Sequence, residues 1–232
     1  MKLYIIILTL LSTSALGQFI GNDPIDETNL RPWTATNIRD YQGVYHFGIS
    51  EVESNLFLII VRNKVYGQIR SGHFSEDGRM WMWEYENIND IRIEGNKFFS
   101  ERANGEFVRY RNGSGEVTGL KINSPWSANL DPGEYEIGTR TSTLEEYLSG
   151  DYIEASLILL TAEDLKTITK NELRVMRNEI FARYGLRFKS GGQMDVYFRQ
   201  KSWYQGQHDN VDKFLTHLEK SNIRLIKEVE GL

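Results

Sequence analysis

Residues 181–185 read FARYG, and the helix that contains them can be located from local signals at both of its ends. Thr169 and Glu172 have the spacing of a capping box, which predicts that the helix begins at Thr169. Gly185 suits the left-handed position that ends a helix, and Leu186 then contacts the last turn in a Schellman ending. The sequence therefore predicts one helix from residue 169 to 184.

An apolar stripe runs along this helix. Its members recur at helical spacing and are Leu173, Met176, Ile180 and Tyr184, with polar side chains on the flanks. A second capping signal, Thr161 with Asp164, precedes it, and two further amphipathic segments follow. Together these patterns predict a four-helix unit over residues 153–232 that buries one core and folds independently.

The order of motifs in this region resembles the YARHG domain family. The matching residues are Leu160-Thr161 to Leu165, Glu172-Leu173-Arg174, Arg177-Asn178-Glu179-Ile180, FARYG, Phe188-Lys189, Tyr197-Phe198, Trp203-Tyr204, Asn210-Val211 and Leu225-Ile226-Lys227. The resemblance covers about the last third of the chain and implies a small helical module of a secreted or envelope-associated bacterial protein, with no activity attached. Phe181 and Tyr184 replace the Tyr and His of the family name, so no motif histidine is present here.

Composition narrows the class of protein. The 232 residues are 40% hydrophobic and 25% charged, which is ordinary for about two globular domains. There are no cysteines, so disulfides, thiolate catalysis and zinc sites built on cysteine are excluded. The formal net charge of −5 disfavours general binding to nucleic acid.

The N-terminus has the pattern of a secretory signal peptide at residues 1–17. One lysine precedes a short apolar run, and small residues at Ala15 and Gly17 suit cleavage after Gly17. The run is shorter than the roughly 20 apolar residues that span a bilayer. We therefore expect an exported protein, periplasmic or extracellular, with no membrane span in its mature form. Residues 18–40 read as a polar tether, in which Trp33 packs against the next domain as a plug.

Residues 41–123 show short alternating strands separated by turn signals such as Asp77-Gly78 and Gly95-Asn96. Residues 56–61 are apolar on both faces, which predicts a central strand. The pattern is that of an antiparallel β meander, closed as a small barrel or packed as a sandwich. Residues 124–152 hold two prolines, several glycines and six acidic residues, and read as a hinge. The predicted fold class is therefore α+β in two domains.

Aromatic and acidic side chains alternate along one predicted strand. Trp81, Trp83 and Tyr85 share one face, and Glu84 and Glu86 share the other. The aromatic face can bind a sugar or line an apolar pocket. Two carboxylates beside aromatic rings are also how a glycosidase site begins, so a glycan-directed hydrolase using Glu84 and Glu86 stays an alternative. A third interpretation is a barrel that carries a small apolar ligand.

Arginines form the most conspicuous cationic cluster of the helical region. Arg174, Arg177 and Arg183 can bind an anion, because the guanidinium fork matches carboxylate and phosphate groups. The same side chains can instead serve the structure, since Glu179 lies four residues before Arg183 in the favourable order for a helical ion pair.

Motifs for catalysis are missing from the sequence. The four histidines have no metal-ligand spacing, and no nucleophile elbow or phosphate-binding loop is present. We expect no metal and no cofactor. The sequence therefore predicts a non-catalytic binding module whose partner is an envelope glycan, a small apolar ligand or another envelope protein.

Overall fold

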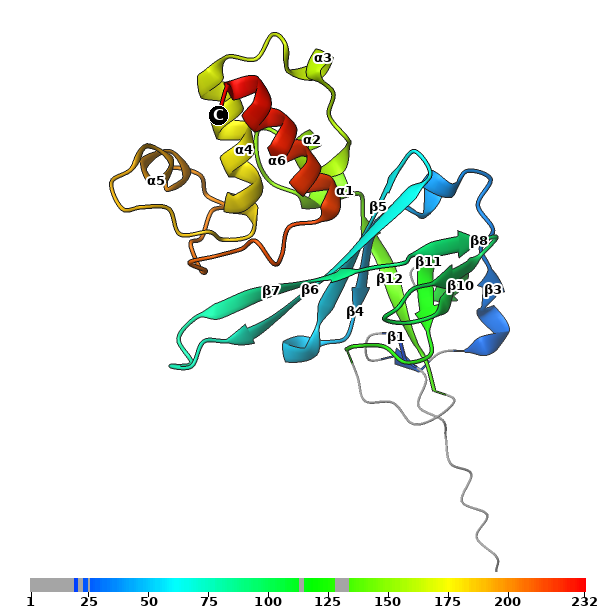
Figure 1. Cartoon of the computed structure of the whole chain (residues 1–232). Helices are drawn as coiled ribbons and strands as arrows, with labels where there is room; N and C mark the ends of the chain where they lie inside the picture. Colours follow the sequence, from blue (N-terminus) through cyan, green and yellow to red (C-terminus); the bar gives the residue numbers. More distant parts are fainter. Residues whose placement is uncertain (1–18, 21–22, 25, 113–114, 128–133) are drawn as a thin grey trace, which may run out of the picture.

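The structure is a computed structural model that describes residues 19–20, 23–24, 26–112, 115–127 and 134–232. An antiparallel sheet forms the N-terminal part and helices form the C-terminal part, as Figure 1 shows. The predicted α+β class, with a β-rich region before a helical one, is confirmed. The predicted signal peptide, residues 1–17, lies outside the described residues.

The elements follow one another in a simple order. The strands are β1 (Phe19–Ile20), β2 (Asp23–Pro24), β3 (Arg31–Pro32), β4 (Gly43–Phe47), β5 (Ser54–Val61), β6 (Lys64–Phe74), β7 (Trp81–Ile88), β8 (Arg92–Glu94), β9 (Lys97–Phe99), β10 (Gly105–Asn112), β11 (Gly115–Ile122) and β12 (Glu136–Ser142). The helices are α1 (Leu144–Tyr147), α2 (Glu154–Leu157), α3 (Ala162–Leu165), α4 (Lys170–Arg183), α5 (Gln193–Phe198) and α6 (His217–Glu230). Short 3-10 turns are η1 (Glu27–Asn29), η2 (Ile38–Tyr41) and η3 (Ser50–Val52).

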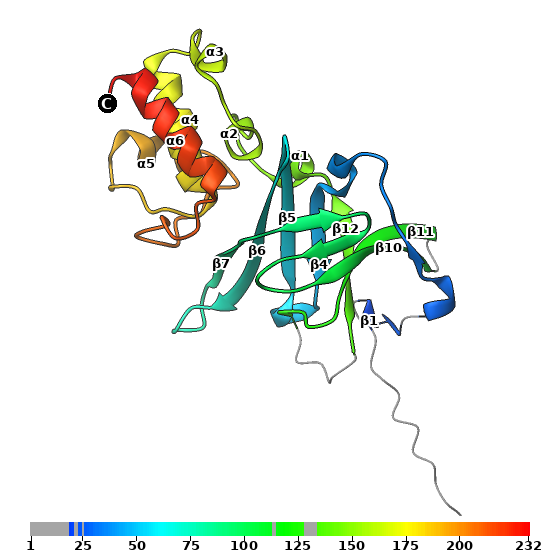
Figure 2. The same cartoon turned by 45° about the vertical axis from the view of Figure 1, so that its right-hand side comes forward.

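The sheet is curved but open. Its strand order is β7-β6-β5-β4-β12-β11-β10-β9-β8, and the strands along this path pair antiparallel. The two end strands, β7 and β8, do not pair with each other. The predicted antiparallel β meander is confirmed, but of its two expected forms, barrel or sandwich, the closed barrel is wrong. In Figure 2 the β6–β7 hairpin extends beneath the helices instead.

The centre of the sheet comes from the segment expected to be a hinge. Strand β12 lies between β4 and β11, with Thr139 opposite His46 and Gly138 opposite Leu120. Gly138 is a strand residue because the ring of Phe47 covers it, and an added Cβ would lie 2.2 Å from that ring. Close approach of a ring explains this glycine, which in the sequence resembles a turn signal.

Part of the expected tether belongs to the sheet as well. Strand β3 pairs with β10, and Trp33 is only 6% exposed. Its ring packs edge-on against Tyr41 and Phe107, with centroid separations of 5.0 and 6.0 Å. The prediction that Trp33 packs against the β domain is confirmed.

Strand β5 is buried on both faces, as its apolar sequence predicts. Leu56, Leu58 and Ile60 join the core on the concave side, while Phe57 and Ile59 join a second core that includes residues of the helices. The concave side is filled by the buried side chains Trp33, Tyr41, Tyr45, Phe47, Leu56, Leu58, Ile60, Ile69, Ile88, Phe98, Phe107, Leu120 and Ile122. A packed interior and an open sheet leave the barrel-carrier hypothesis without support.

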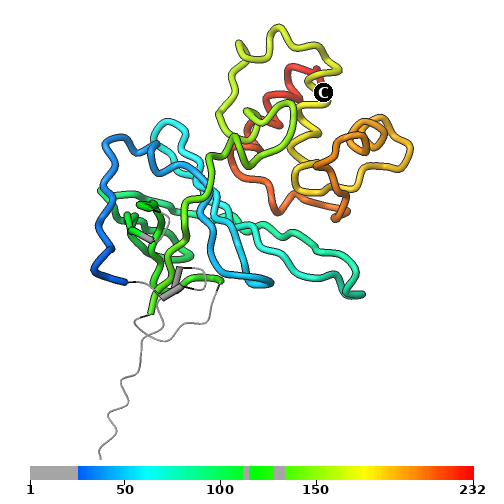
Figure 3. The backbone as a smooth tube through the Cα atoms, turned by 180° about the vertical axis from the view of Figure 1, so that it is seen from behind, coloured from blue at the N-terminus to red at the C-terminus, as the bar shows by residue number. Residues whose placement is uncertain are grey.

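Helices α4 and α6 lie beside each other and form the body of the helical region, as Figures 1 and 3 show. The capping box of Thr169 and Glu172 starts α4. Gly185 has a φ of 73°, and its N–H donates to the carbonyl of Ala182 at 2.9 Å. The N–H of Leu186 donates to Phe181 at 3.1 Å, which completes the predicted Schellman ending.

The apolar stripe of α4 faces inward as expected. Leu173, Met176, Ile180 and Tyr184 are all buried in the helical core. Four of the six described helices are short, with only four to six residues, so the region is more irregular than a bundle of four regular helices.

Candidate functional site

The helical region covers the free edge of strand β7. The backbone N–H of Trp83 donates to Gln207 Oε1 at 3.0 Å, and Gln207 Nε2 donates to the carbonyl of Trp81 at 2.8 Å. His208 Nε2 lies 2.8 Å from the Trp83 carbonyl. These side chains satisfy backbone groups that an edge strand otherwise leaves open, so the two regions form one packed unit.

Tyr184 of FARYG links three elements. Its hydroxyl lies 2.8 Å from Glu219 Oε2 on α6 and 3.1 Å from Gln68 Oε1 on β6. Its ring packs edge-on against Tyr85 of β7 at 4.7 Å. Burial and the neighbouring Glu219 carboxylate raise the pKa of Tyr184 well above its usual value, so the hydroxyl stays a neutral donor.

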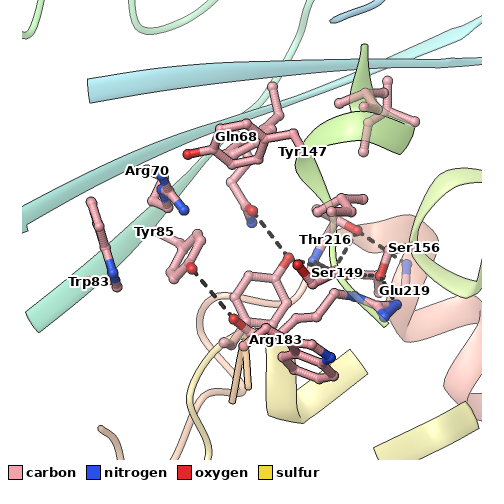
Figure 4. A pocket seen from close by; sticks show the side chains of 16 residues that line it. Gln68, Arg70, Trp83, Tyr85, Tyr147, Ser149, Ser156, Arg183, Thr216 and Glu219 are labelled. Atoms are coloured by element: carbon pink, nitrogen blue, oxygen red, sulfur yellow. Dashed lines mark hydrogen bonds between the residues drawn. The ribbon is translucent and has the colours of Figure 1, made fainter. Parts of the chain in front are cut away.

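A cavity of about 180 Å³, partly open to solvent, lies between the sheet and the helices. Figure 4 shows side chains from both regions around it. The lining residues are Phe57, Ile59, Gln68, Arg70, Trp83, Tyr85, Leu144, Tyr147, Leu148, Ser149, Ser156, Arg183, Tyr184, Trp203, Thr216 and Glu219. Aromatic and aliphatic groups therefore alternate with a few polar groups, as in small-molecule pockets.

Arg70 on β6 brings a positive charge to this cavity. Its guanidinium carbon lies 4.1 Å from the ring centroid of Trp83 and 4.7 Å from that of Tyr147, which are cation–π contacts. Its Nε atom is buried and has no hydrogen-bond partner among the described residues. Burial lowers the pKa of Arg70 from its usual value, whereas the Tyr85 hydroxyl and the Glu53 carboxylate oppose that shift.

Arg183 of FARYG is held by a buried ion pair. Its Nη1 donates to Glu179 Oε1 at 2.8 Å, and its Nη2 donates to Ser156 Oγ at 3.0 Å. The Glu179 carboxylate also accepts the backbone N–H groups of Asp151 and Tyr152, each at 2.8 Å. The predicted pair between Glu179 and Arg183 is thus present, and it fixes α4 to the start of the helical region.

Glu219 supplies a buried carboxylate on the α6 side of the cavity. It forms a capping box with Thr216, whose N–H and hydroxyl each donate to it at 2.9 Å. Ser156 Oγ donates to its other oxygen at 2.6 Å, and Tyr184 lies within hydrogen-bonding distance. These donors satisfy both oxygens of the carboxylate, which lies in the first turn of α6.

The structure brings three of the predicted binding residues together and separates the others. Trp83, Tyr85 and Arg183 all line the cavity. Trp81 packs on Trp83 with centroids 5.9 Å apart but faces a separate hollow beside η3.

The other two predicted arginines have partners outside the cavity. Arg174 donates to Gln193 at 2.8 Å. Arg177 donates to both oxygens of Glu230, at 2.6 and 3.3 Å.

The two acidic residues of the hydrolase alternative have different partners. Glu84 pairs with Lys213 at 3.1 Å, and Glu86 pairs with Arg102 at 3.4 Å. Neither carboxylate lines the cavity. This geometry therefore does not support a pair of carboxylates that acts across one cleft.

Sequence reasoning missed several lining residues, above all Arg70, Tyr147 and Glu219. Arg70 and Gln68 lie two residues apart on β6, a spacing that places both on one face. That polar alternation was available in the sequence, but it resembles an ordinary solvent face. Glu219 carried the clearer signal, because Thr216 and Glu219 have the spacing of a capping box.

Two features are absent from the described residues, a metal-binding cluster and a membrane-spanning helix. No group of three or more histidine, aspartate or glutamate side chains is placed to hold a metal ion there. No helix in the described part of the chain has the length and apolar character to cross a membrane.

Comparison with known proteins identifies the helical region. Residues 150–231 match the YARHG domain family, and the N-terminal part is not matched. The chain is also 33% identical over 70 residues to a protein of Sulfurovum sp. (strain NBC37-1) named pyrimidine/purine nucleoside phosphorylase. That similarity covers 30% of this chain and 58% of the relative, so less than two thirds of the relative is represented. No solved structure was found to match.

Proposed function

We propose that this chain is an exported, non-catalytic binding protein whose ligand lies in the cavity between the sheet and the YARHG domain. One observation carries the proposal: both regions contribute side chains to this cavity, in which polar groups converge on apolar walls. Loss of contact between the two regions would therefore remove the site.

Binding without catalysis agrees with the state of Glu219, which lines the cavity, and of Glu179, which pairs with the lining residue Arg183 but does not itself line the cavity. Glu219 is surrounded by the donors Ser156, Tyr184 and Thr216. A general acid or base needs a carboxylate that is free to exchange a proton with a substrate. These two carboxylates are instead engaged in holding the helices in place.

Export is the second part of the proposal. It is supported by the signal-peptide pattern of residues 1–17 and by the kind of protein that the YARHG resemblance implies. We expect the mature protein to begin at Gln18. Mass spectrometry of the protein recovered outside the cytoplasm tests this, and a mature chain that retains residues 1–17 would contradict it.

A cavity-filling variant tests ligand binding at this place. Ser149 lines the cavity, so Ser149→Phe should abolish the thermal stabilisation that a bound small molecule gives to the wild-type protein. Ser190→Phe is the matched control, because Ser190 is an exposed serine like Ser149 but lies outside the cavity. A library of envelope glycans, lipids and small metabolites is screened on all three proteins. Ligands that stabilise the wild type and Ser149→Phe equally would contradict the proposed site.

The similarity to a nucleoside phosphorylase gives a second candidate function. The observation in its favour is the 33% identity over 70 residues. Incubation of the mature protein with pyrimidine and purine nucleosides and inorganic phosphate, followed by chromatography of the released bases, tests it. We expect no release above that of the Ser149→Phe variant, and release that depends on phosphate would replace the binding proposal with an enzymatic one.

A further inference from the structure

The ligand chemistry follows from Arg70, which has the Tyr85 hydroxyl and the more distant Glu53 carboxylate in its surroundings but no carboxylate in an ion pair with it among the described residues. Within the described residues it has no ion-pair partner at 4.0 Å or less, and its buried Nε atom has no acceptor. The rings of Trp83 and Tyr147 lie close to its guanidinium and exclude water there. A guanidinium removed from water without a carboxylate is unfavourable unless an anion reaches it.

A second arginine of the cavity, Arg183, supports the same ligand chemistry. Four buried side-chain atoms in the described residues lack a hydrogen-bond partner, and two of them are the Nε atoms of Arg70 and Arg183. Both arginines line the cavity. Buried donors without partners are rare in folded proteins and call for an acceptor. An oxyanion in the cavity supplies acceptors that the protein itself does not provide.

The walls set the size and character of the rest of the ligand. The cavity measures about 180 Å³. A cavity of about 150 Å³ lined by apolar side chains is known to hold benzene, so this space corresponds to one substituted ring. Apolar contacts are offered by Phe57, Leu144, Tyr147, Leu148 and Trp203. A single substituted ring therefore matches the volume of this cavity.

The carboxylate of Glu219, on the α6 side of the cavity, limits the ligand to one acidic group. Glu219 is a buried carboxylate of this cavity without an ion-pair partner among the described residues, and Ser156 Oγ stands between it and Arg183. A second acidic group on the ligand would be repelled by Glu219 in a site with little water. We propose that the cavity binds an aromatic monocarboxylate whose carboxylate is bound by Arg70. This inference rests on the proposed binding function.

The experiment compares two ligands of the same shape and different charge. Calorimetric titration of the mature protein uses benzoate and its neutral counterpart benzamide, together with inorganic phosphate and phthalate. We expect benzoate to bind at least about 10-fold more tightly than benzamide, since hydrogen bonds to charged groups are the stronger kind. Phosphate lacks the ring and phthalate has a second acidic group, so both should bind more weakly than benzoate.

Variants assign the preference to one arginine. Arg70→Gln should weaken benzoate binding by about 10- to 100-fold and leave benzamide unaffected. Arg70→Lys keeps the charge and loses the planar fork, so it should fall between the two, and it serves if Arg70→Gln does not fold. Arg174→Gln is the matched control, because it removes the same charge from the same protein at an exposed position outside the cavity.

The outcomes separate this inference from the proposed function. Equal binding of benzamide and benzoate, both lost in Ser149→Phe, would keep the cavity as a binding site and overturn the role of Arg70. Benzoate binding that survives Arg70→Gln unchanged would also overturn that role. Tight binding of phosphate alone would overturn the requirement for a ring. Absence of heat with every ligand at millimolar concentration, with no stabilising compound in the screen, would overturn both proposals.

Discussion

The helical region and the sheet differ in the sequence distance over which their structure is determined. In the helical region, Thr169 caps α4 together with Glu172, three residues away, and Gly185 ends the same helix with a φ of 73°. In the sheet, the central pair joins β4 to β12, with His46 opposite Thr139. Local rules therefore describe the first region, whereas the second depends on which distant strands meet.

The largest effect is expected in the sheet, at a residue that looks like part of a tether. Trp33→Ala should lower the free energy of unfolding by about 3–5 kcal/mol, because it removes a buried ring from the core beside Tyr41 and Phe107. Ile38→Ala is the control, since Ile38 is 39% exposed. Chemical denaturation measures both variants. Equal, small effects would show that the segment is a tether after all.

The end of α4 is the next strongest test. Gly185→Val should lower the free energy of unfolding by about 3 kcal/mol, because it forces a β-branched residue to positive φ. Its Cβ would also lie 3.0 Å from the carbonyl oxygen of Gln205. Gly191→Val separates the two causes, since Gly191 has a φ of 72° with nothing within 4 Å of the added Cβ. A neutral Gly185→Val in denaturation would show that local signals place the helix end wrongly.

The contact between the two regions gives a smaller effect. Gln207→Ala should cost about 1–2 kcal/mol, because it removes two hydrogen bonds to the edge of β7. It should also speed hydrogen exchange at the backbone N–H of Trp83. Gln200→Ala is the control, since Gln200 is exposed and belongs to the same region. Unchanged exchange at Trp83 would mean that the regions move independently.

The helix cap should give the smallest effect. Thr169→Ala should cost about 1 kcal/mol, because Thr169 accepts the N–H of Glu172 in the first turn of α4. Thr167→Ala, at an exposed residue outside the helix, should stay within about 0.5 kcal/mol of the wild type. Thermal unfolding of the two variants side by side measures the difference. Indistinguishable melting temperatures would remove the cap as a determinant of the helix.

The fold was predictable where the signal and the contact lie close together in the sequence. The cap, the stripe and the end of α4 were all correct for this reason. Strand β5 was also predictable, because burial on both faces leaves an unbroken apolar run. Strand β12 was not, since Gly138 is required by the ring of Phe47, which lies far away in the sequence. A glycine under a ring and a glycine in a turn look alike before the strands are paired.

The candidate site shows the same limit. Trp83, Tyr85 and Arg183 were identified from the sequence, but as members of two unrelated clusters in separate domains. Only the packing of the helices over β7 joins them. Arg70 was missed because a polar residue that alternates on a strand normally faces water. Its importance depends on Tyr147, which reaches it from another element.

The most direct test of the shared site is a crystal structure of the mature protein grown with 4-bromobenzoate, whose bromine gives an anomalous signal. The account predicts the bromine inside the cavity between the sheet and the helices, with the carboxylate within hydrogen-bonding distance of the Arg70 guanidinium. A bromine bound elsewhere, with only water on Arg70, would contradict it.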